Sequence, residues 1–72
     1  MKKPLTKHQE KILNIIKDFI NKNGYSPTVR EIGKLSDLKS PATIKTYLDI
    51  LYTKGYITYI PKLSRTIRII ES

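Results

Sequence analysis

The side chains best suited to chemistry lie on one face of residues 41–54. Successive residues of a helix are about 100° apart, so placing Ile44, Leu48 and Leu51 toward a core turns a polar set outward. That outward set is Ala42, Lys45, Thr46, Asp49 and Thr53, with Thr43 at its edge. Such groups suit base edges in the major groove of DNA, which a recognition helix usually reads with its first turns. The alternative interpretation is an ordinary solvated face.

The charge of the chain favours the same kind of partner. Fourteen Lys and Arg against six Asp and Glu give a net charge of +8 and a pI near 9.9. Residues 39–68 hold most of the excess, with Asp49 as their single acidic residue. This composition is typical of proteins that bind a polyanion, most commonly nucleic acid. The alternative is a lysine-rich surface that only keeps a small protein in solution.

A second group of residues is suited to contact phosphate. Residues 62–65 form a basic connection that could follow a phosphate backbone or a minor groove. The helix start at Ser40 and Pro41 can also hold a phosphate, because its free N–H groups and positive dipole end are exposed. The residues that we expect on the DNA backbone are Thr28, Lys39, Lys54, Lys62 and Arg65. Simple capping of the helix and a charged turn that protects an edge strand are the alternatives.

Several classes of site are missing from the sequence. No Cys and a single His exclude the usual zinc sites and a Cys–His nucleophile. There is no carboxylate pair, no phosphate-binding glycine loop and no nucleophile with its base, and His8 fits a surface position. We therefore expect no catalytic residue, metal, cofactor or small-molecule substrate. No apolar run is long enough for a bilayer or a signal peptide, so we expect a soluble, cytoplasmic protein.

The first predicted helix begins after Thr6, which forms a capping box with Gln9. Its apolar residues recur at three- and four-residue spacing, which is typical of an amphipathic helix. They are Ile12, Leu13, Ile16, Phe19 and Ile20. The helix ends at residues 23–24, because Gly24 takes the left-handed position after the last turn without steric cost.

The second predicted helix covers residues 28–36. Thr28 and Glu31 form another capping box, and Ile32 and Leu35 give the helix a narrow apolar stripe. We therefore expect a short helix that ends near Ser36.

The third predicted helix follows a three-residue turn, 37–39, in which Leu38 is the apolar anchor. Ser40 is its N-cap, Pro41 occupies the first helical position, and Gly55 ends it. Two short helices joined by such a turn match the helix-turn-helix layout.

Beyond the third helix the apolar period changes to two. Residues 56–60 alternate and stop at Pro61, and residues 66–70 alternate again, which predicts a β-hairpin. Three helices and a small hairpin in a single domain, residues 1–72, are the outline of a winged helix-turn-helix. The expected fold is therefore mainly α with a small β-hairpin.

Five tyrosines suggest a different hypothesis, the stacking of bases from single-stranded nucleic acid. Tyr47, Tyr56 and Tyr59 lie on or beside the apolar stripes, which favours a structural role. Tyr25 and Tyr52 fit either role.

Three stretches of the sequence resemble the N-terminal DNA-binding domain of LexA repressors, and the likeness extends over nearly the whole chain. They are Thr6-x-x-Gln9 with Ile12-Leu13, the specific run Gly24-Tyr25-Ser26-Pro27-Thr28-Val29-Arg30-Glu31-Ile32-Gly33, and Leu48-x-x-Leu51-x-x-Lys54-Gly55-Tyr56-Ile57. The resemblance implies a winged helix-turn-helix that binds operators of DNA-damage-inducible genes as a dimer. It also implies which positions face the bases. They are Ser40, Ala42, Thr43, Lys45 and Thr46.

The sequence departs from the family pattern in two respects. LexA proteins continue into a self-cleaving serine–lysine protease domain that supplies most of the dimer contacts, so we expect either an excised domain or a stand-alone relative. The family usually has Gly in the turn between the second and third helices, where this chain has Asp37. Asp tolerates left-handed geometry better than most residues, so the turn is expected to form.

Together these features predict sequence-specific binding of duplex DNA by a transcriptional repressor of LexA type, acting at operators of DNA-damage (SOS) genes on the bacterial nucleoid. We expect a monomer when free, with pairing on palindromic half-sites. One alternative is a winged-helix module that docks on another protein, which would need exposed Leu, Phe or Met on the third helix. The other is a mobile-element regulator that lacks the self-cleavage response.

Overall fold

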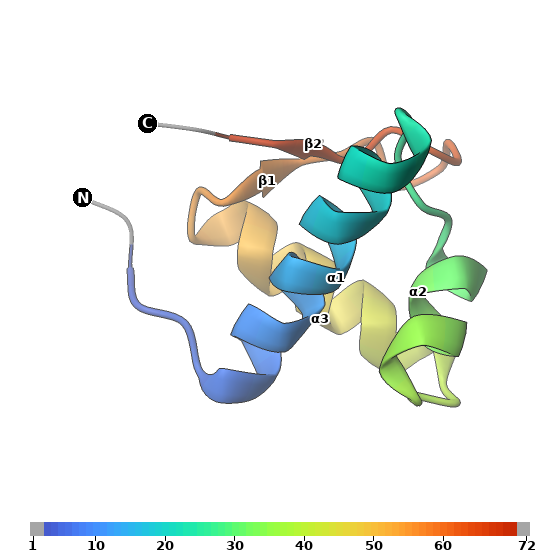
Figure 1. Ribbon diagram of the computed structural model, residues 1–72. Helices are drawn as coiled ribbons and strands as arrows, with labels where there is room; N and C mark the ends of the chain where they lie inside the picture. The colour runs from blue at the N-terminus through green and yellow to red at the C-terminus, as the bar shows by residue number, and fades with distance from the viewer. Residues whose placement is uncertain (1–2, 71–72) are drawn as a thin grey trace.

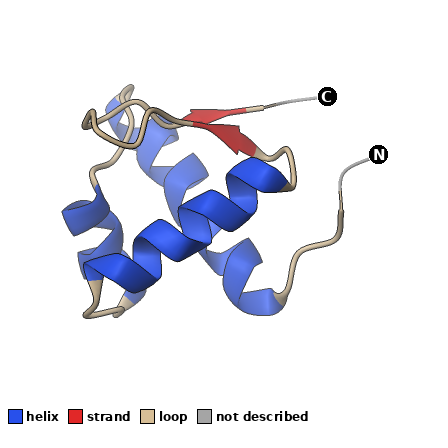
Figure 2. Cartoon of the chain, turned by 180° about the vertical axis from the view of Figure 1, so that it is seen from behind, coloured by secondary structure: helices blue, strands red, loops and turns tan. Residues whose placement is uncertain are grey.

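The computed structural model describes residues 3–70, which form three helices followed by a two-stranded antiparallel sheet (Figure 1). The helices are α1 (Lys7–Asn23), α2 (Val29–Ser36) and α3 (Pro41–Thr53), and the strands are β1 (Ile57–Thr58) and β2 (Arg68–Ile69). This order confirms the winged helix-turn-helix expected from the sequence. Seen from behind, α3 crosses in front of the other helices, and the hairpin lies at one end of it (Figure 2).

Both predicted capping boxes are present at the starts of α1 and α2. The Thr6 side chain accepts a hydrogen bond from the Gln9 N–H at 3.2 Å, and the Thr6 N–H donates to Gln9 Oε1 at 3.1 Å. The Thr28 side chain and N–H make the same reciprocal pair with Glu31, at 3.1 and 2.9 Å. Each box satisfies N–H groups that the first turn leaves without helical partners.

The first two helices each end at a residue with left-handed backbone conformation, as expected. Gly24 follows α1 with φ 76°, and Asp37 follows α2 with φ 62°. Asp37 thus adopts the conformation that glycine adopts most easily. The start of α3 differs in one detail: Ser40 is the N-cap residue, but its side chain makes no capping hydrogen bond.

In the described part of the chain the core consists of nine buried hydrophobic residues, which come from all three helices and from the hairpin. They are Ile12, Leu13, Ile16, Ile32, Ile44, Leu48, Leu51, Ile57 and Ile67. The stripes predicted for the first and third helices are therefore confirmed at their centres. Leu35 was expected in the α2 stripe and is instead 55% exposed; the buried residues of this short helix are Ile32 and Ser36, one turn apart. Tyr47, Tyr56 and Tyr59 pack against the core, as predicted.

The sheet is shorter than the alternating pattern predicts. Among residues 3–70, only 57–58 and 68–69 form strands, with Ile57 paired to Ile69. Beyond them the Thr66 hydroxyl bonds to both backbone groups of Ile60, accepting from its N–H at 2.9 Å and donating to its carbonyl at 3.2 Å. These side-chain bonds stand where backbone bonds of a longer sheet would lie. Residues 59–67, between the two strands, form the loop of the wing.

Within residues 3–70, no helix combines the length and apolar character needed to cross a membrane. The same part of the chain contains no cluster of three or more side chains that could hold a metal ion.

Candidate nucleic-acid interface

The outer face of α3 is exposed as the sequence predicts. Ile44, Leu48 and Leu51 are buried against the rest of the protein, which fixes the orientation of the helix. The exposed residues of this face are Ser40, Ala42, Thr43, Lys45, Thr46, Asp49 and Thr53. The first two turns therefore present small and polar side chains that leave room for a partner to approach closely.

Lys45 and Thr46 differ in how free their polar groups are. The Thr46 hydroxyl donates to the Ala42 carbonyl at 3.0 Å, one turn earlier in the helix. Its methyl group and its remaining acceptor capacity are available at the surface. Lys45 lies between two surface hollows, one bordered by the wing and the other by α2. Its ammonium group can therefore reach across the middle of the exposed face.

The hollow between α2, α3 and the wing is rimmed by positive charge. Its charged residues are Arg30, Lys45, Asp49, Lys62 and Arg65, four cations and one carboxylate. Sequence reasoning missed Arg30, which is exposed in the first turn of α2 and borders both hollows. The available signal was its position two residues after the Thr28 cap, because that end of a helix-turn-helix faces the same side as the start of α3.

The one carboxylate of this rim is held by a tyrosine. The Tyr59 hydroxyl donates to Asp49 Oδ1, and the Tyr59 ring meets Tyr52 edge-on at 6.0 Å. Burial raises the pKa of Tyr59 to about 12, and the hydrogen bond to Asp49 and the charge of Asp49 act in the same direction. The tyrosine therefore stays a neutral donor near neutral pH, and it ties the wing to α3.

Of the expected phosphate contacts, some are exposed beside the hollows and others make hydrogen bonds within the protein. Lys39 and Lys62 are exposed, Lys39 just before α3 and Lys62 in the wing, and each borders a hollow that also includes Lys45. Thr28 is half-buried in its capping box. Lys54 lies at the other end of α3, where its Nζ donates to the Pro4 carbonyl at 2.9 Å and to Gln9 Oε1 at 2.8 Å.

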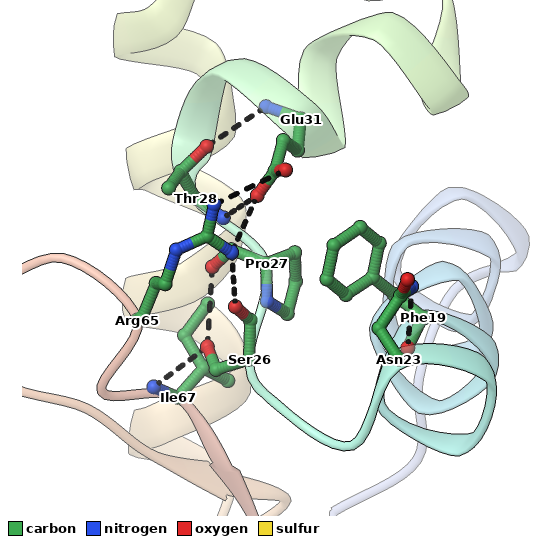
Figure 3. A network of polar contacts seen from close by, with 8 residues as sticks. All are labelled: Phe19, Asn23, Ser26, Pro27, Thr28, Glu31, Arg65 and Ile67. Carbon is green, nitrogen blue, oxygen red and sulfur yellow. Dashed lines mark hydrogen bonds and ion pairs between the residues drawn. The ribbon is translucent and has the colours of Figure 1, made fainter.

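Arg65 is the most heavily engaged of the predicted phosphate ligands (Figure 3). Its Nη1 lies 2.9 Å from Glu31 Oε1 and donates to the Ser26 carbonyl at 3.0 Å, while Nη2 donates to Glu31 Oε2 at 3.3 Å. The guanidinium also lies over the Tyr25 ring, 4.7 Å from its centroid. The backbone hydrogen bond from Thr28 lowers the pKa of Glu31, against the effect of desolvation, and Arg65 lowers it further.

The sequence that forms this surface matches a known family of DNA-binding domains. The LexA DNA binding domain model matches residues 2–66. This chain belongs to that family. Its helix-turn-helix is formed by α2 and α3, and the hairpin after them is the wing.

Curated relatives named LexA repressor are similar over almost the full length of the chain. The protein of Caldicellulosiruptor saccharolyticus is 48% identical over 71 residues, which are 99% of this chain and 35% of the relative. That of Carboxydothermus hydrogenoformans is 42% identical over 97% of this chain and 35% of its own length. That of Staphylococcus aureus is 43% identical over 94% and 33%. The chain thus spans about a third of the length of these relatives.

Proposed function

We propose that this LexA-type domain binds duplex DNA sequence-specifically and represses transcription at operators of DNA-damage genes. The supporting observation is the exposed, polar first half of α3 beside a hollow bordered by the exposed cations Arg30, Lys45 and Lys62. Polyanion binding and base recognition need different groups, and this surface supplies both. The partner would be an operator on the bacterial nucleoid, occupied by two copies on palindromic half-sites.

The base-reading residues in this proposal are Ser40, Ala42, Thr43, Lys45 and Thr46. Lys45 is long enough to donate to guanine O6 and N7, and Thr46 offers a methyl group suited to thymine. The Ser40 hydroxyl makes no bond to its own helix, so it can turn to the DNA. Lys39 and Lys62 are the phosphate contacts that their exposure supports best.

The test is selection of bound sequences from a pool of random duplexes, followed by affinity measurements on the selected and random duplexes over a range of salt concentrations. Sequence-specific binding yields a palindromic consensus and a higher affinity for it at every salt concentration. Affinity for random duplex alone, falling with salt, would identify a non-specific DNA-binding surface instead. Absence of DNA binding would leave the protein-docking alternative.

A further inference from the structure

Besides the Tyr59–Asp49 hydrogen bond, an arginine joins the wing to the helix-turn-helix. Arg65 reaches from the wing loop to the segment that leads into α2, where Figure 3 shows the Glu31 carboxylate and the Ser26 carbonyl oxygen beside its guanidinium. The Tyr25 ring also lies against the guanidinium. Tyr25 in turn makes an edge-to-face contact with Phe19 of α1, with the ring centroids 5.6 Å apart. The arginine therefore joins the wing to groups from two other parts of the fold.

A second contact lies next to the first. The Ile67 N–H donates to Ser26 Oγ at 3.1 Å, and both residues are buried. Since β1 and β2 contain only two residues each, the sheet gives the wing loop little support of its own. The position of the loop relative to α3 must then depend on these side-chain contacts together with the Tyr59–Asp49 hydrogen bond.

The backbone of Arg65 is also in a conformation that arginine rarely adopts. Its φ is 58°, and among residues 3–70 only Asp37 shares a positive φ without being glycine. Left-handed geometry is unfavourable for a residue with a long side chain. An arginine at this position is more readily explained by what its side chain binds than by the needs of the turn.

We propose that Arg65 is a positioning residue, whose guanidinium fixes the wing against the start of α2 so that the wing and α3 meet DNA at one spacing. Glu31 then has two tasks, because its carboxylate completes the capping box of α2 and receives Arg65. The charge of Arg65 is offset within the protein instead of on a DNA phosphate. The inference rests on the proposed function, because its effect is seen in sequence-specific binding.

The deciding experiment is Glu31→Gln. A phosphate-contacting Arg65 and a wing-positioning Arg65 predict changes of opposite sign in the affinity for the selected duplex. Glutamine keeps a capping box, as Gln9 does at the start of α1 in this same chain. If Arg65 contacts phosphate, the substitution frees it and removes a negative charge, so DNA binding strengthens. If Arg65 positions the wing, affinity for the selected duplex falls about two- to fivefold, the range for a half-exposed ion pair. Affinity for random duplex changes less.

The matched control is Glu10→Gln, which removes the same charge from an exposed site in the first turn of α1. It should bind DNA as tightly as the unmodified protein or slightly better. The second variant is Arg65→Lys, which keeps the charge but loses the planar fork that engages both carboxylate oxygens. Positioning predicts a loss for the selected duplex like that of Glu31→Gln, with an unchanged salt dependence.

A measurement without DNA checks the geometry itself. Amide hydrogen exchange at Ile67 should quicken in Glu31→Gln and Arg65→Lys but not in Glu10→Gln, while α2 stays protected.

The inference is wrong if Glu31→Gln binds the selected duplex as tightly as Glu10→Gln, or if Arg65→Lys binds it like the unmodified protein. Arg65 would then be the phosphate contact expected from the sequence. If the unmodified protein does not discriminate between duplexes, the proposed function fails and this role fails with it.

Discussion

Lys45 and Asp49 stand one helical turn apart on the exposed face of α3, yet their charges are in different situations. The Asp49 carboxylate is held toward the wing by the Tyr59 hydroxyl, whereas Lys45 extends between the two hollows. An acidic group on a DNA-binding face is repelled by phosphate unless it is directed elsewhere. The tyrosine thus leaves the lysine as the charge that an approaching duplex meets at the centre of the helix.

We expect Lys45→Ala and Thr46→Ala each to lower affinity for the selected duplex more than affinity for random duplex. A good base contact contributes about 1–3 kcal/mol of discrimination, and a phosphate contact contributes none. The fold should be retained, because both side chains are exposed and Ala favours helix more than either residue. The measurements are the affinity ratio and the thermal midpoint of each variant.

Lys11→Ala is the matched control for Lys45, since it removes the same charge from an exposed position on α1. It should lower both affinities by a similar small factor. An unchanged affinity ratio in both α3 variants would remove this face from base recognition.

The raised pKa of Tyr59 leads to a prediction about pH. Its pKa is about 12, above the usual value of about 10, so the neutral form is favoured in the folded protein. The stability that it contributes is complete below about pH 10 and is lost as the pH rises through about 12. An ultraviolet titration should show one late tyrosine that disappears in Tyr59→Phe and persists in the control Tyr52→Phe. A late tyrosine that survives Tyr59→Phe would contradict the assignment.

At the scale of the elements, helices were predictable because their signals are local. A capping box joins residues three apart, and an apolar stripe repeats within one helix, so Thr6, Thr28 and the α3 stripe could be read from short windows. The wing was not predictable in the same way. Arg65 binds Glu31, 34 residues earlier in the chain, and no local pattern indicates that partner. Lys54 is a similar case, with its bond to Pro4 spanning 50 residues.

The turn between α2 and α3 carries a prediction about stability. Asp37 is exposed and has φ 62°, a conformation that disfavours any side chain without a short polar group. We expect Asp37→Ala to lower the free energy of unfolding by about 1 kcal/mol and Asp37→Gly to retain or raise it. Chemical denaturation measures both. Equal stability of the Ala and Asp proteins would show that the turn relaxes to another conformation.

At the scale of the whole molecule, the candidate interface extends beyond α3 to two other elements. Arg30 comes from α2, Lys45 from α3 and Lys62 from the wing, and all three border one hollow. The position of α3 relative to the core follows from its buried stripe, which the sequence shows. The position of the wing relative to α3 follows from contacts between distant residues, so the composition of the hollow emerged only from the folded chain.

The size of the molecule bears on how two copies would share one operator. The longest extent of the described residues is 30 Å, close to the axial rise of one turn of DNA, about 34 Å. Two copies on half-sites one turn apart would therefore lie on the same side of the duplex and meet only at their edges. Such a small contact gives cooperativity on DNA without a stable dimer in solution.

We therefore expect a monomer in sedimentation experiments on the free protein, and cooperative binding only when the half-sites lie about one turn apart. Inserting about five base pairs rotates one copy to the opposite side of the duplex, so cooperativity should disappear while the affinity of each half-site is retained. The measurement is a titration of duplexes that carry one selected half-site, two half-sites about one turn apart, or the same two with the insertion between them. A tight dimer without DNA, or cooperativity that is insensitive to the insertion, would show that pairing depends on a surface other than these edges.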